Sequence, residues 1–148
     1  MIRVISAALV LTGFLSMSAG ADEAARTAAL ETMDNFLAGF NARDEQAWAD
    51  SLLFPHVRMA SSSVVVYPDK AAFVEAMDLD AFAADTGWRR STWDDMKIIQ
   101  ASDQKVHVQV IFSRFNADDE LMASFDSLYI IERVDGRWGV RARSSFAP

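Results

Sequence analysis

The stretch Tyr129–Trp138, with the sequence YIIERVDGRW, is the most informative segment of the chain for its architecture. Segments rich in aromatic and β-branched residues lie on both sides of its Asp135-Gly136 pair. An Asp-Gly pair between two such segments is a strong signal for a β-hairpin with a two-residue turn. The sequence therefore predicts one long strand at 121–134 and another at 138–146, joined by a tight turn.

Helical patterns dominate the first half of the chain. Apolar residues from Ala25 to Phe40 recur at the spacing of an amphipathic helix. The predicted elements that precede the final hairpin are helices at 22–43 and 45–52, a hairpin with strands at 56–60 and 64–67, a helix that opens at Pro68-Asp69, and strands at 88–100 and 105–115. We interpret the acidic stretch 78–85 as a solvated loop. Three helices packed on one face of an antiparallel sheet make an α+β fold, and residues 22–148 are expected to form one domain.

The first 21 residues have the composition of a secretory signal peptide. Arg3 precedes an apolar run, Val4–Leu15, that is too short to span a bilayer comfortably, and Ala19-Gly20-Ala21 fits the small-residue pattern of a signal-peptidase site. We predict cleavage after Ala21 and a periplasmic or secreted domain without membrane association. The alternative is an uncleaved membrane anchor.

Charge and cysteine content exclude several classes of function. The 148 residues carry a formal net charge of −7 and contain no cysteine. An acidic chain is poorly suited to nucleic acid, because phosphate binding requires clustered Lys and Arg. Without cysteine there is no disulfide, no cysteine-ligated zinc and no thiol nucleophile.

Three segments of the chain resemble the NTF2-like superfamily, in particular its SnoaL-like and ketosteroid-isomerase-like members. These segments are Phe36–Asp44, Leu53–Arg58 and Tyr129–Trp138, and the resemblance extends over residues 22–148. It implies a strongly curved sheet wrapped around helices into a cone with an interior pocket. It also implies a homodimer that forms through the outer face of the sheet. The superfamily includes isomerases, dehydratases, cyclases, transport adaptors and binding modules, so the resemblance implies no single activity.

The resemblance also allows a test for the catalytic groups of ketosteroid isomerase. That chemistry uses a carboxylate base together with a tyrosine and a protonated aspartate as oxyanion donors. Alignment on the first helix and the final hairpin places Ala60, Phe36 and Tyr129 at these three positions. Two of the groups are missing and the third is a phenol, so proton abstraction by this route is not supported.

Alternation along the strands predicts which side chains face the pocket. Ala60 occupies the base position of the first strand. If Ala60 faces inward, His56 and Arg58 also face inward, because they lie on the same side of that strand. Two parities are open for the last strand. We adopt the one that directs Arg141 and Arg143 inward and Val140 outward; the other places Val140 in the core and both arginines outside.

The inward arginines raise the question of what balances their charge, because buried cations must be paired. An internal carboxylate is one answer, with Asp94, Asp95 and Asp126 as candidates. An anionic ligand held by guanidinium groups is the other. The sequence leaves both open.

Metal and cofactor sites are not expected. The chain has two histidines, His56 and His107, which are not at a metal-ligand spacing, and His107 shares the more polar face of its strand with Gln109. The sequence contains no HExxH, GxSxG, P-loop or GxGxxG pattern.

We therefore expect the pocket to bind a small, partly apolar molecule that could be anionic, with no assignable catalysis. The predicted ligand-binding residues are Phe36, His56, Arg58, Ala60, Tyr129, Arg141 and Arg143, with Phe40, Phe54, Phe125 and Ile131 as further apolar walls. One alternative is a SnoaL- or dehydratase-like lyase or isomerase, with His56 as the acid–base group and Tyr129 as the oxyanion donor in the same cavity. A second alternative is a protein-interaction module that uses the convex sheet face, which requires a filled interior.

Overall fold

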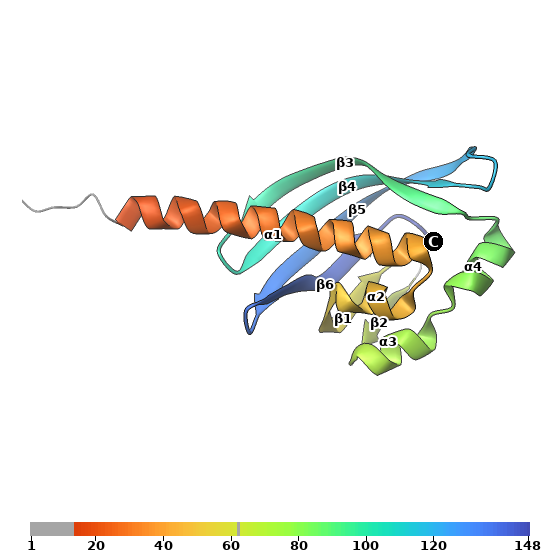
Figure 1. Cartoon of the computed structure of the whole chain (residues 1–148), viewed down its shortest axis with the longest axis horizontal. Coiled ribbons are helices and arrows are strands. Elements are labelled where there is room, and N and C mark those ends of the chain that lie inside the picture. The colour runs from red at the N-terminus through yellow and green to blue at the C-terminus, as the bar shows by residue number, and fades with distance from the viewer. Residues whose placement is uncertain (1–13, 62) are drawn as a thin grey trace, which may run out of the picture.

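A computed structural model describes residues 14–61 and 63–148. Its elements in chain order are α1 (Phe14–Ala42), α2 (Glu45–Asp50), β1 (Leu52–Met59), β2 (Val64–Tyr67), α3 (Lys70–Ala76), α4 (Leu79–Thr86), β3 (Arg90–Ala101), β4 (Lys105–Phe115), β5 (Leu121–Val134) and β6 (Arg137–Ser145). The helices lie on one side of a curved sheet, and α1 runs along its inner face (Figure 1). The predicted α+β architecture is thus confirmed.

Two helices differ from the sequence prediction. Helix α1 begins at Phe14, not at residue 22, and residues 14–21 contain no proline to interrupt it. Residues 1–13, most of the predicted signal peptide, lie outside the described residues. The stretch predicted as a solvated loop forms α4, because Asp78 caps its first turn by accepting a hydrogen bond from the Ala81 amide (2.8 Å) and Gly87 ends it at φ +76°.

The six strands form one sheet in the order β2-β1-β6-β5-β4-β3. The predicted purely antiparallel sheet needs a correction, because β1 and β6 pair in parallel while the other neighbouring pairs are antiparallel. This pairing places the end of β1 beside the end of β6, although 85 residues separate Arg58 from its partner Arg143. The first and the last strand of the chain therefore contribute to the same region of the inner face.

The core lies between α1 and the inner face of the sheet. The largest fully buried side chains of this layer are Met33, Val106, Val108, Val110, Tyr129, Ile131 and Val140. Helix α2 packs closely against α1 at Gly39, where an added Cβ would lie 2.6 Å from the backbone nitrogen of Trp48. This contact positions Trp48 beside Phe36 and Phe40, with ring centroids 5.4 and 4.9 Å apart.

Candidate functional site

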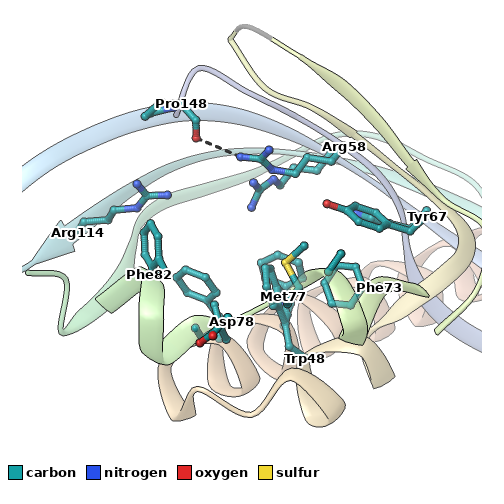
Figure 2. Close-up of a pocket in the computed structure, with 15 residues that line it drawn as sticks. Trp48, Arg58, Tyr67, Phe73, Met77, Asp78, Phe82, Arg114 and Pro148 are labelled. Atoms are coloured by element: carbon teal, nitrogen blue, oxygen red, sulfur yellow. Dashed lines mark hydrogen bonds between the residues drawn. The ribbon is translucent and has the colours of Figure 1, made fainter. Parts of the chain in front are cut away.

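A partly open cavity of about 320 Å³ lies between α3, α4 and the inner face of the sheet. This volume is within the usual range for small-molecule pockets. The strands contribute its polar wall, which consists of His56, Arg58, Tyr67, Arg114 and Arg143. The helical side contributes an apolar wall: Figure 2 shows Phe73 and Met77 across the cavity from Arg58, and Phe82 next to Arg114.

Three arginines on three different strands converge on this cavity. Arg58 of β1 and Arg143 of β6 are register partners on adjacent strands, and Arg114 comes from β4. None of these guanidinium groups forms an ion pair with an Asp or Glu side chain in the described part of the chain. In particular, the three aspartates considered as internal partners, Asp94, Asp95 and Asp126, form no ion pair with them there. Arg58 instead donates from Nη2 to the backbone oxygen of Pro148 (3.1 Å; Figure 2).

Burial and the proximity of the other cations lower the pKa values of Arg114 and Arg58. Burial, reinforced by the charges of Arg143 and Arg58, lowers the pKa of Arg114 from 12.5 to about 10. Burial and then the charge of Arg143 also lower the pKa of Arg58. The Arg114 guanidinium lies over the rings of Phe82 and Phe125, with its Cζ 5.1 and 5.3 Å from their centroids. Its buried Nε has no hydrogen-bond partner within residues 14–61 and 63–148.

His56 is neutral in this environment. The residue is only 3% exposed, and burial lowers its pKa from 6.5 to about 4. Hydrogen bonding to the backbone of Val140 and Arg141 opposes this shift, and the charges of Arg143 and Arg141 assist it. Its Nδ1 lies 3.0 Å from the Val140 carbonyl oxygen. A carbonyl only accepts, so Nδ1 carries the proton and donates, and Nε2 is left as a bare acceptor.

Tyr129 is in the inner layer and lines a separate pocket of about 20 Å³, which shares Phe36, Phe40, Arg114 and Arg143 with the cavity but does not include His56. The residue is 1% exposed, its ring packs edge-on against Phe36 at 5.4 Å, and the Cζ of Arg143 lies 6.0 Å from its centroid. Burial raises the pKa of its phenol. The lyase or isomerase hypothesis required Tyr129 and His56 to face one cavity, and the geometry does not meet that condition.

The prediction that the whole of β6 follows one parity is wrong. A bulge at Arg141 shifts the register, so that Ile131 pairs with Val140 while Ile130 pairs with Ala142. As a result Val140 is fully buried and Arg143 faces the cavity on the same side of the sheet. Arg141 does not line the cavity; its Nε donates to Glu132 (2.9 Å) and its Nη1 to the Pro55 carbonyl (3.1 Å).

The other predicted residues divide into two groups. Phe36, Phe40, His56, Arg58 and Arg143 line the cavity. Ala60 does not, because β1 ends at Met59 and the Ala60 amide donates to Ser63 in the turn (2.8 Å). Three further predicted walls lie elsewhere in the core or in the sheet: Phe54, Phe125 and Ile131.

Several lining residues were missed by the sequence analysis. Arg114 had a usable signal, because the buried residues of β4 occupy even positions through Phe112 and the same alternation directs Arg114 inward. Tyr67 also had one, since it is the hairpin partner of His56. Met77 and Phe82 had none, because their positions depend on how α3 and α4 pack across the cavity mouth.

No group of three potential metal ligands is brought together within 14–61 and 63–148. No helix in the part of the chain that the structure covers has the length and hydropathy needed to cross a bilayer.

The chain was also compared with known proteins. The family described as NTF2-like protein (DUF6841) matches residues 23–145. No curated protein matches the chain. An NTF2-like protein with a cystatin-like fold from Novosphingobium aromaticivorans superimposes with a TM-score of 0.73 at 10% identity, over 93% of this chain and 91% of that one.

Two further solved structures share the fold at low identity. A Catenulispora acidiphila protein in complex with S-DNPA gives a TM-score of 0.66 at 15% identity, over 84% of this chain and 93% of that one. ActVI-ORFA from Streptomyces coelicolor gives 0.61 at 20% identity, over 81% and 94%. These similarities confirm the predicted NTF2-like, SnoaL-like fold.

Proposed function

The chain belongs to the NTF2-like protein family DUF6841, and from this premise we propose that it binds a small organic anion with an apolar body in the cavity between α3, α4 and the sheet. The observation that carries the proposal is the charge of the cavity wall. Three guanidinium groups face one cavity in a chain whose net charge is −7. An unpaired cation is costly to bury, so an anion placed among them would be stabilised.

Asp78 is the acidic side chain among the described residues that line the cavity, and one of its oxygens caps a helix. Asp78 Oδ1 accepts from the Ala81 amide at the start of α4 (2.8 Å), and the side chain lies on the helical wall (Figure 2). It forms no ion pair with the arginines of the strand wall in the described structure. Positive charge exceeds negative charge around the cavity, and guanidinium groups suit carboxylates because they donate in a planar fork.

The opposite wall supports an apolar ligand body. Phe73 is buried against Trp48 and Tyr67, while Met77 and Phe82 complete the helical side (Figure 2). Such a division, with mainly apolar walls and a few convergent polar groups, is typical of small-molecule sites. The S-DNPA complex of the Catenulispora acidiphila neighbour supports a small-molecule role for this fold. The interaction-module alternative requires a filled interior, which a cavity of about 320 Å³ does not favour.

Isothermal titration with matched naphthalene probes tests the proposal. We expect 2-naphthoate to bind and its neutral analogue 2-naphthylmethanol to bind at least about tenfold more weakly, since a hydrogen bond to a charged group contributes about 1.5–3 kcal/mol. Arg143→Met should remove most of that difference. The matched control Arg133→Met deletes an exposed arginine outside the cavity and should leave it unchanged. Equal binding of the acid and the alcohol would refute the proposal.

We also propose that residues 1–21 are removed during export, which yields a periplasmic or secreted domain. The family match supports this proposal because it begins at Glu23, two residues after the predicted cleavage site. The test is the intact mass of protein recovered from the periplasmic fraction of a bacterial host. A chain that begins at Asp22 is expected, and a chain that retains residues 1–21 would contradict the proposal.

The predicted homodimer remains a proposal as well. Ile99 and Ile111 are 45% and 38% exposed on β3 and β4, which supports an apolar contact on the outer sheet face. Light scattering coupled to gel filtration should give twice the monomer mass, and Ile111→Glu should reduce it. A monomeric wild-type protein at high concentration would contradict the proposal.

A further inference from the structure

We propose that the ligand of this cavity carries a hydroxyl group apart from its anionic group, and that His56 Nε2 is the acceptor that selects for this hydroxyl. The inference rests on the proposed function and narrows its ligand class to hydroxylated organic acids. It follows from the geometry of one buried ring, its single available nitrogen and its position relative to the arginines.

The His56 ring is held in one orientation. Its Nδ1 donates to the carbonyl of Val140, a fully buried residue of β6, at 3.0 Å. Tyr67 stacks against one side of the ring, with centroids 6.3 Å apart and planes 22° apart, and Phe73 meets it edge-on at 6.2 Å. A ring that is fixed by one nitrogen presents the other nitrogen in a defined tautomer and direction.

Nε2 is therefore the nitrogen of His56 that can accept a hydrogen bond, and His56 lines the cavity. Among the described residues, no protein group donates a hydrogen bond to it, and the Tyr67 hydroxyl, whose oxygen points into the cavity in Figure 2, is not bonded to it. An acceptor to which no protein group donates takes its hydrogen bond from water or from a ligand. A ligand hydroxyl can donate this hydrogen bond. A carboxylate oxygen cannot, because it and Nε2 would face each other with lone pairs and no proton between them.

The charged groups around His56 keep it in this acceptor form. Arg143 and Arg141 are the cations that disfavour a second proton on the ring, and burial acts in the same direction. The anionic end of a ligand is thus directed to Arg58, Arg114 and Arg143 and away from the imidazole. The cavity separates two polar functions, one that receives a negative charge and one that receives a hydrogen-bond donor.

The strand geometry sets the distance between these functions. His56 and Arg58 are two residues apart on the same face of β1, so their backbones are separated by roughly 7 Å. Arg143 lies beside Arg58 on the adjacent strand and reinforces the same end. A rigid aromatic acid with its hydroxyl on the ring remote from the carboxylate would reach both functions.

Titration with hydroxynaphthoates tests the inference. We expect 6-hydroxy-2-naphthoate or 7-hydroxy-2-naphthoate to bind about three- to tenfold more tightly than 2-naphthoate, which is the gain of one net hydrogen bond. The 3-hydroxy isomer should gain nothing, because its hydroxyl is bonded to its own carboxylate. The 6- and 7-methoxy analogues, which cannot donate, should also gain nothing. If all the acids bind equally, this inference fails and the proposed function stands; if none binds, the proposed function fails too.

Variants identify the acceptor. His56→Phe should bind the hydroxylated and plain acids equally, whereas the matched control His107→Phe should keep the wild-type preference, since His107 lies outside the cavity. Tyr67→Phe should also keep the preference. If Tyr67→Phe abolishes it and His56→Phe does not, the Tyr67 hydroxyl is the selecting group and the inference is overturned.

A measurement on the wild-type protein covers the case in which His56→Phe does not fold. The chain has only two histidines, so long-range proton–nitrogen NMR spectra contain two imidazole rings. The Nε2 resonance of His56 should show the unprotonated signature and move upfield when the preferred hydroxynaphthoate binds, but stay in place with 2-naphthoate. The His107 ring is the internal reference. An Nε2 that carries the proton in the free protein would overturn the inference.

Discussion

Replacement of His56 by glutamine should remove a specific part of the acid sensitivity of the fold. In the native protein, burial holds the pKa of His56 at about 4, while in the unfolded chain it returns to about 6.5. Between these two pH values the unfolded state binds a proton that the folded state does not. The stability associated with the neutral ring is therefore complete above pH 6.5 and is lost as the pH falls toward 4.

The magnitude follows from the two pKa values. Each pH unit between them corresponds to about 1.4 kcal/mol, so the free energy of unfolding should fall by about 3 kcal/mol between pH 7 and pH 4 through His56 alone. Carboxylates such as Glu132, whose pKa is lowered by its hydrogen bond to Lys105, add acid sensitivity at lower pH. The difference between wild type and the variant separates the histidine contribution from theirs.

The assay is urea unfolding at closely spaced pH values from 7 to 4, followed by tryptophan fluorescence. The stability of wild type minus that of His56→Gln should shrink by about 3 kcal/mol across this range. The matched control His107→Gln retains His56 and should keep the His56 share of the pH dependence. If the two glutamine variants have the same pH dependence as wild type, the buried neutral imidazole is not as described and the hydrogen-bond reasoning built on it is refuted.

Three further outcomes are expected. Gly39→Ala should destabilise the fold by more than about 2 kcal/mol in urea unfolding, despite the better helix propensity of alanine, because its Cβ would lie 2.6 Å from the backbone nitrogen of Trp48. Asp44→Ala should cost about 1 kcal/mol, since Asp44 accepts the Ala47 amide at the start of α2 (2.9 Å), and an unchanged melting temperature would contradict this role. Arg141→Met should leave 2-naphthoate affinity within about twofold of wild type, because Arg141 lies outside the cavity, and a loss similar to that of Arg143→Met would show that the bulge is misplaced.

The sequence alone was sufficient for the class of fold and the identity of most elements. Local signals acted over short distances: the Asp135-Gly136 pair specified the last hairpin, and the helical spacing from Ala25 to Phe40 specified most of α1. The alternation of side chains along a strand predicted that His56 and Arg58 share one face of β1, and both residues line the cavity. These features depend on the conformational preferences of neighbouring residues, which the sequence contains directly.

Only the three-dimensional fold determines how the first and the last strand pair. Parallel pairing of β1 with β6 places Arg143 beside Arg58, and a bulge at Arg141 allows Val140 and Arg143 to face the same side. A one-residue bulge reverses every later side chain of a strand, and no local preference in the sequence marks where it occurs. The sequence therefore determined which strands and helices form, whereas the register between distant strands determined which arginine reaches the cavity, because that register depends on packing between segments far apart in the chain.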